Sequence, residues 1–68
     1  MYYINLNNPL NNRIKFKNQR ESAKIIGIAH ETLNRILSGK QGCSKVIAYC
    51  ITKCYDKEAE IENYFVKE

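Results

Sequence analysis

The chain has 68 residues, enough for one domain, and a domain of this size buries only about 60% of the surface that its unfolded chain exposes. No apolar stretch approaches the roughly 20 residues of a membrane-spanning helix, and the N-terminus lacks the pattern of a signal peptide, so we expect a soluble cytoplasmic protein. The net charge of +4 is unevenly placed: residues 1–53 carry nine basic and two acidic side chains (+7), and residues 54–68 carry two basic and five acidic ones (−3). A basic region beside an acidic one suits a protein that binds phosphate backbones, although charge alone does not identify one.

The N-terminal segment supports two alternative predictions. Apolar and polar residues alternate in residues 2–6 and again in residues 13–17, with turn-forming asparagines between them, which predicts a short β-hairpin. The alternative is a first helix that begins near Pro9, with Leu10 and Ile14 facing inward. Local periodicity favours the hairpin. Residues 13–17 also lie too close to Asn18 to leave room for a normal loop between a first helix and the next one.

Residues 19–40 carry the most informative pattern, which predicts two short helices joined by a tight turn. Asn18 suits the N-cap of the first helix, with Glu21 three residues later completing a capping box. Gly27 can take the positive φ that ends this helix and turns the chain. Ser38-Gly39 then ends the second helix. Two helices in this arrangement form a helix-turn-helix, whose second helix enters the major groove of DNA in many proteins.

The apolar residues of this segment agree with the same arrangement. Ala23 is small where the second helix must cross the first, and Ile28 fills the turn. Leu33 and Ile36 place an apolar stripe against Ile26 at helical spacing.

Two further helices are predicted after the motif. Ser44 can cap a helix with one apolar face, formed by Ile47, Cys50, Ile51 and Cys54. Asp56 can cap a last helix that buries Ile61, Tyr64 and Phe65 and leaves its glutamates exposed. The expected fold is therefore mainly α, a single bundle of four to five helices over residues 1–68, with the short N-terminal hairpin as an optional addition.

The motif resembles the DNA-binding domain of lambda-repressor-like (Xre/Cro-type) transcriptional regulators. The matching positions are Gln19, Ala23, Gly27, Ile28, Leu33, Ile36 and Ser38-Gly39-Lys40. Two positions depart from the family pattern: Ser22 stands where an apolar residue is usual, and Ala29 where Ser or Thr often caps the second helix. The resemblance implies a bundle of about five helices, with a helix rather than a hairpin near Pro9.

The resemblance also implies which residues contact DNA. The base-reading positions are Ala29, His30, Glu31, Asn34 and Arg35, and the phosphate-contacting positions are Gln19, Lys40 and Lys45. Arg35 is the best candidate for a bidentate contact to guanine, and Asn34 suits adenine or a phosphate. Glu31 either accepts from a cytosine amine or pairs with Arg35 one helical turn later.

Metal binding and catalysis are not expected. Three cysteines and one histidine do not have the paired spacing of a structural zinc site, and Cys50 and Cys54 are better explained as small apolar residues. The odd cysteine count also argues against a disulfide framework. No nucleophile, phosphate loop or carboxylate pair suggests an enzyme or a cofactor.

The expected function is sequence-specific binding of double-stranded DNA by a small repressor of a phage or mobile element, acting as a homodimer on a palindromic operator. Dimerisation would also compensate for the marginal stability of so short a chain. The alternative is a protein-binding inhibitor or antitoxin-like module, for which the five tyrosines would suit an interface. Binding to single strands would require exposed aromatic residues on a sheet.

Overall fold

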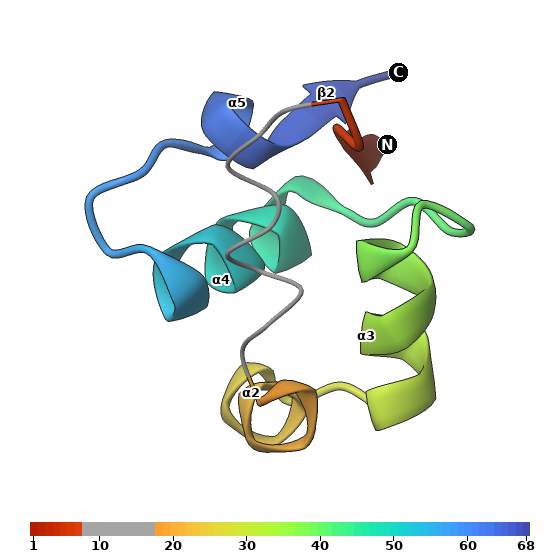
Figure 1. Ribbon diagram of the computed structural model, residues 1–68, viewed down its shortest axis with the longest axis vertical. Helices are drawn as coiled ribbons and strands as arrows, with labels where there is room; N and C mark the ends of the chain where they lie inside the picture. The colour runs from red at the N-terminus through yellow and green to blue at the C-terminus, as the bar shows by residue number, and fades with distance from the viewer. Residues whose placement is uncertain (8–17) are drawn as a thin grey trace.

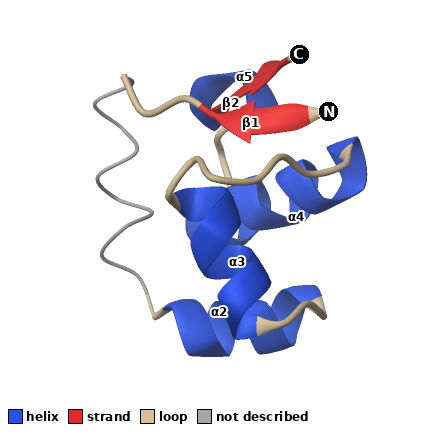
Figure 2. Cartoon of the chain, turned by 90° about the vertical axis from the view of Figure 1, so that its right-hand side faces the viewer, coloured by secondary structure: helices blue, strands red, loops and turns tan. Residues whose placement is uncertain are grey.

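The structure, a computed structural model, describes residues 1–7 and 18–68. Within these ranges the chain is mainly α-helical, as predicted, with four helices and one small antiparallel sheet (Figure 1). The elements in chain order are β1 (Tyr2–Ile4), α2 (Gln19–Ile26), α3 (His30–Leu37), α4 (Lys45–Tyr55), α5 (Ile61–Tyr64) and β2 (Phe65–Lys67). The sheet and α5 lie at one end of the molecule, α2 lies at the other, and α3 forms one side (Figures 1 and 2).

The N-terminal strand is present, but its pairing differs from the predicted hairpin. β1 pairs antiparallel with β2, in a register that places Tyr2 opposite Lys67 and Ile4 opposite Phe65. On its other edge Tyr2 exchanges two backbone hydrogen bonds of 2.8 Å with Cys43. β2 and Cys43 are both distant from β1 in sequence, so no local turn pattern could predict these pairings. The predicted second strand, residues 13–17, and the alternative helix from Pro9 lie outside the described residues.

Asn18 and Gly27 close the ends of α2, as predicted, although the reciprocal bond of the predicted capping box, from the Asn18 N–H to Glu21, is not formed within residues 1–7 and 18–68. Asn18 Oδ1 accepts from the backbone N–H of Glu21 at 3.1 Å, which satisfies one of the free donors of the first turn. At the other end Gly27 has a φ of 92°, and its N–H and that of Ile28 both donate to the Ala23 carbonyl oxygen. This left-handed closure turns the chain sharply into α3.

Helix α3 begins without a side-chain cap and ends at a glycine. Ala29 occupies the N-cap position and makes no capping hydrogen bond, as its side chain predicts. Gly39 has a φ of 82°, its N–H donates to the Ile36 carbonyl oxygen, and the Lys40 N–H donates to the Arg35 carbonyl oxygen. This pair of bonds is a Schellman motif, which satisfies carbonyl groups that the helix end would otherwise leave unpaired.

One hydrophobic core joins all of these elements. Within the motif the buried apolar residues are Ala23, Leu33, Ile36 and Leu37, with Ile26 and Ile28 partly buried against them. Ser22, the polar departure from the family pattern, is also buried, and its hydroxyl donates to the Asn18 carbonyl oxygen at 2.8 Å. An internal partner therefore allows a hydroxyl to stand at an apolar position.

The buried face of α4 lies to one side of the face that the sequence predicted. The predicted N-cap is correct, because Ser44 Oγ accepts from the Ile47 N–H at 3.3 Å. The predicted apolar face gave too much weight to the cysteines, since Cys50 and Cys54 are only half-buried. Ile51 is buried as predicted, and the other buried residues of the helix are Ala48, Thr52 and Tyr55. Thr52 can be buried because its hydroxyl donates to the Ala48 carbonyl oxygen at 2.9 Å.

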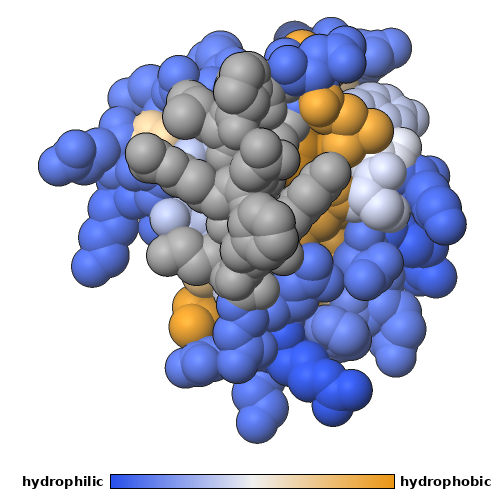
Figure 3. Space-filling model, in the orientation of Figure 1, coloured by the Kyte–Doolittle hydropathy of each residue, from blue (hydrophilic) through white to orange (hydrophobic). Residues whose placement is uncertain are grey.

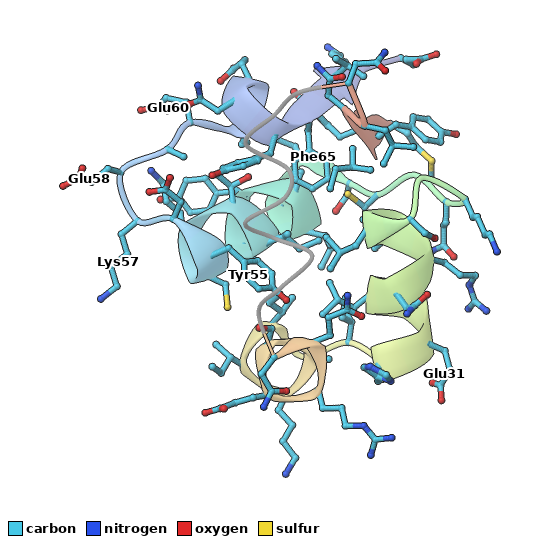
Figure 4. The ribbon with its side chains drawn as sticks, viewed as in Figure 1. Glu31, Tyr55, Lys57, Glu58, Glu60 and Phe65 are labelled. Carbon is cyan, nitrogen blue, oxygen red and sulfur yellow. The ribbon has the colours of Figure 1, made fainter. Side chains whose placement is uncertain are left out.

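The last helix is shorter and begins later than predicted. Asp56 does not cap it: this residue follows the end of α4, and Glu60 is the N-cap of α5. The Glu60 N–H donates to Asn63 Oδ1 at 2.7 Å, which closes the first turn of α5. Ile61, Tyr64 and Phe65 are buried as predicted, although Phe65 belongs to β2 and points from the sheet toward α4 (Figure 4). Among the described residues, no helix is long and apolar enough to cross a membrane.

Candidate nucleic-acid interface

The outer face of α3 gathers the side chains that the sequence analysis assigned to base reading. His30, Glu31, Asn34 and Arg35 together line one open hollow of about 290 Å³. Ala29 is exposed at the start of the same helix. The helix lies at the surface in Figure 2, and Glu31 points away from the molecule in Figure 4.

This face is polar because the opposite face of the same helix is buried. Leu33, Ile36 and Leu37 are each no more than 2% exposed, and their spacing places them on one side of the helix. They pack against α2 and the sheet, so the helix is held along its length on the inner side. The polar side chains between these apolar residues must then face solvent.

Gln19 lies beside this face, although it belongs to α2. Asn34 Nδ2 donates to Gln19 Oε1 at 3.4 Å, and both side chains line a second hollow with Leu37 and Ser38. The left-handed turn at Gly27 brings the start of α2 to the middle of α3. A predicted phosphate contact and a predicted base contact are therefore neighbours.

Arg35 is held by a residue that the sequence analysis did not select. Its Nε donates to Gln41 Oε1 at 3.1 Å. No ion pair joins Arg35 to Glu31 within the described part of the chain, so the structure gives Arg35 a different partner from the one considered. A glutamine in a loop carries no distinguishing sequence pattern, which is why Gln41 was missed.

The loop that carries Gln41 is attached to the rest of the fold at both sides. Before it, the Lys40 N–H donates to the Arg35 carbonyl oxygen at 2.9 Å. After it, the ring of Tyr3 lies so close to Gly42 that a Cβ there would come within 2.8 Å of the ring. The next residue, Cys43, forms the bridge to Tyr2. The sheet thus fixes the position of a loop on the α3 side.

Exposed basic side chains lie on α2 and beyond the end of α3, although the acidic Glu31 belongs to this face and the acidic Glu21 lies among the basic residues of α2. Lys40 and Lys45 are both exposed, one just after α3 and the other at the start of α4. Arg20 and Lys24 are exposed on α2. Figure 3 shows hydrophilic residues over the end of the molecule that α2 forms. Glu58 and Glu60, by contrast, project from the side opposite α3 in Figure 4.

One lysine of the basic region has a structural use. Lys53 is half-buried, and its Nζ donates to the Ala59 carbonyl oxygen at 2.8 Å and to the Lys57 carbonyl oxygen at 3.3 Å. The same ammonium lies 5.7 Å from the centre of the Tyr49 ring. Counting lysines and arginines in the sequence therefore overestimates the number of cationic groups available to bind a ligand.

Among the described residues, the cysteines and Tyr55 do not form a second site. Cys43 is buried, and burial raises the pKa of its thiol, which disfavours the reactive thiolate. Across residues 1–7 and 18–68 no three His, Cys, Asp or Glu side chains come close enough together to hold a metal ion. Tyr55 is 7% exposed, and its hydroxyl, directed toward α2 in Figure 4, finds no hydrogen-bond partner among the described residues.

No protein-family model matches this chain, and no characterised protein or solved structure shows significant similarity to it. The geometry of α3 and its surroundings is therefore the basis for inferring a function.

Proposed function

We propose that the protein binds double-stranded DNA in a sequence-specific manner and acts as a small transcriptional repressor. The observation that supports this most directly is the outer face of α3, where four polar side chains that can pair with base edges share one open hollow. A helix held by its inner face, with donors and acceptors on its outer face, has the form of a recognition helix. The resemblance of residues 19–40 to lambda-repressor-like regulators agrees with this proposal.

In the proposed complex, α3 lies in the major groove. Arg35 donates to the O6 and N7 atoms of a guanine, and Asn34 addresses an adjacent adenine or a phosphate. Gln19 and the exposed Lys40 and Lys45 contact phosphates on either side and set the orientation of the helix without reading sequence.

The proposal includes a homodimer on a palindromic operator. A single α3 offers few base contacts, and two copies related by a two-fold axis would double them and place two recognition helices one turn of DNA apart. Repression would follow from occupation of the site, since polymerase cannot use DNA that a dimer covers.

Fluorescence anisotropy with the DNA just upstream of the protein's own gene tests this proposal against a scrambled duplex. We expect strong preference for the upstream DNA, two protein chains per site, and affinity that falls steeply as salt rises. Lys40→Ala should weaken binding to both duplexes, whereas Lys57→Ala, which removes an exposed lysine on the side opposite α3, should leave both unchanged. Equal, weak binding of the wild type to both duplexes would contradict the proposal.

A second candidate function is binding of a protein partner, and one observation favours it. Val46 and Tyr49 are 69% and 53% exposed on α4, and Ile25 is 70% exposed on α2, which leaves apolar side chains in contact with water. Failure of the DNA experiment would make a pull-down with wild-type protein and Tyr49→Ser the next test of this alternative.

A further inference from the structure

Arg35, like Asn34 on the same helix, has one donor that already has a partner within the protein. An arginine can approach a guanine in two ways, with the two terminal Nη groups or with Nε and one Nη. In this structure Nε donates to Gln41 Oε1 at 3.1 Å. The side-on approach would require this bond to break, whereas the end-on approach keeps it.

Gln41 is well placed to hold the guanidinium, because its own backbone is anchored. The Schellman closure at Gly39 and Lys40 fixes the start of its loop, and the contact of Tyr3 with Gly42 fixes the following residue. Gln41 is itself half-buried, while Arg35 is exposed. The hydrogen bond therefore ties the long, exposed side chain of Arg35 to a residue whose backbone is fixed. Arg35 should then lose less conformational entropy on binding.

We propose that Gln41 is a positioning residue that presents the two Nη groups of Arg35 to the O6 and N7 atoms of one guanine in each half-site. This inference rests on the proposed function and goes further, because it names the base, the mode of approach and a specificity residue outside the recognition helix. Gln41 itself need not touch the base. Its contribution is to hold the planar guanidinium in an orientation that suits guanine and penalises adenine, which has an amino group in place of O6.

The experiment is selection from a randomised duplex library, followed by competition measurements on the selected site. The proteins compared are wild type, Arg35→Ala, Gln41→Ala and Gln41→Glu, with Lys57→Ala as a matched surface control and circular dichroism to verify folding. We expect the wild type to select a guanine at one position of each half-site, and Arg35→Ala to lose that preference. Gln41→Ala should lower the preference for guanine over adenine at the same position by about 3- to 10-fold, with other positions and binding to random duplex unchanged.

Two further measurements separate positioning from a merely structural role. Replacing the guanine with 7-deazaguanine removes the N7 acceptor, and this change should weaken wild-type binding by a larger factor than Gln41→Ala binding, because the two perturbations act on one contact. Gln41→Glu keeps an oxygen acceptor for Nε, so it should retain the guanine preference while the added negative charge weakens binding to every duplex.

The possible outcomes distinguish this inference from the proposed function. A guanine preference that disappears in Arg35→Ala but is intact in Gln41→Ala would overturn the positioning role and leave DNA reading by α3 in place. A uniform loss for Gln41→Ala on all duplexes would also overturn it, since that result describes a phosphate contact. A wild-type pool without any enriched motif would contradict the proposed function itself.

Discussion

Two connections between helices are closed by different kinds of bond. The turn from α2 to α3 is closed by backbone groups, since the N–H groups of Gly27 and Ile28 both reach the Ala23 carbonyl oxygen. The connection from α4 to α5 has one internal backbone bond, from the Ala59 N–H to the Asp56 carbonyl oxygen at 3.2 Å, and depends otherwise on side chains. There the Lys53 ammonium donates to the Ala59 and Lys57 carbonyl oxygens, and Asp56 accepts from the Glu58 N–H at 3.2 Å and from the Tyr64 hydroxyl at 3.2 Å.

The difference bears on where a ligand can bind. A turn that is closed by its own backbone requires no side chain of α3, so Asn34 and Arg35 stay exposed, with Gln19 and Gln41 as their partners. A connection that is closed by side chains uses its charged groups internally, as Lys53 shows. The four predictions that follow test this contrast, from the largest expected effect to the smallest.

Ala23→Leu should cause the largest loss, because it enlarges a side chain at the centre of the backbone-closed region. Ala23 is 3% exposed where α2 packs against α3 and α4. Forcing a larger side chain into a packed core costs about 1–3 kcal/mol, and the upper end is expected at a helix crossing. Urea denaturation measures the change. Ile25→Leu, at a position 70% exposed on the same helix, should leave stability unchanged; an equal loss there would point to helix propensity instead of packing.

Lys53→Met should come next, because it removes the ammonium that joins α4 to the following connection. Two carbonyl oxygens lose a charged donor, at an expected cost of about 1.5 kcal/mol in free energy of unfolding. Lys57→Met removes a neighbouring exposed lysine and should change stability little. Equal stabilities of the two variants would show that the Lys53 contacts do not hold the connection.

Gly27→Ala should cost about 1 kcal/mol, because an L-residue with a Cβ is strained at a φ of 92°. A Cβ at this position would meet no atom within 4 Å, so the cost is conformational and not steric. Gly27→Asn should cost less, because asparagine tolerates the left-handed region better than alanine. Thermal unfolding of the three proteins checks the order, and an asparagine variant less stable than the alanine variant would argue against this explanation.

Tyr55→Phe should have the smallest effect at neutral pH, neutral or stabilising by up to about 1 kcal/mol, because it removes a buried hydroxyl without a partner among the described residues. The variant should differ more in alkali. Burial raises the pKa of Tyr55 above its ordinary 10.0, the nearby Ser22 hydroxyl opposes this rise without cancelling it, and the Cys54 thiolate adds to it. The unfolded chain therefore loses this proton first as pH rises, and the wild type loses stability between about pH 10 and the folded-state pKa.

Denaturant unfolding at a series of pH values measures this contribution. The Tyr55→Phe curve should be flatter than the wild-type curve above pH 10, and the remaining slope includes Cys43, whose thiol pKa is also raised by burial. Parallel curves for the two proteins would contradict the assignment.

The parts of the fold that could be predicted from the sequence are those set by neighbouring residues. Asn18, Gly27 and Ser44 act within three or four residues of their own positions, so their roles follow from local chemistry. The outer face of α3 could be predicted for the same reason, because Leu33 and Ile36 determine by spacing which side chains remain outside.

The features that were missed depend on contacts between distant or irregular segments. β1 pairs with a strand at the other end of the chain, and Asp56 reaches Tyr64 instead of starting a helix. Thr52 is buried by virtue of a hydrogen bond that hydrophobicity does not represent. The contact between Gln41 and Arg35 depends on the path of a loop, which in turn depends on Tyr2 and Tyr3.

The position of β1 between β2 and Cys43 has a consequence for the order of folding. Its register joins Tyr2 to Lys67, so this pairing closes a loop that spans almost the whole chain. Contacts with such a large separation in sequence form slowly, whereas the local contacts of α2 and α3 form early. The loop that carries Gln41 is attached to the same strand by the bridge between Cys43 and Tyr2. A chain still leaving the ribosome would therefore form α2 and α3 before the loop that carries Gln41 is fixed beside α3, and under the proposed function discrimination between base pairs would be the last property that the newly made protein acquires.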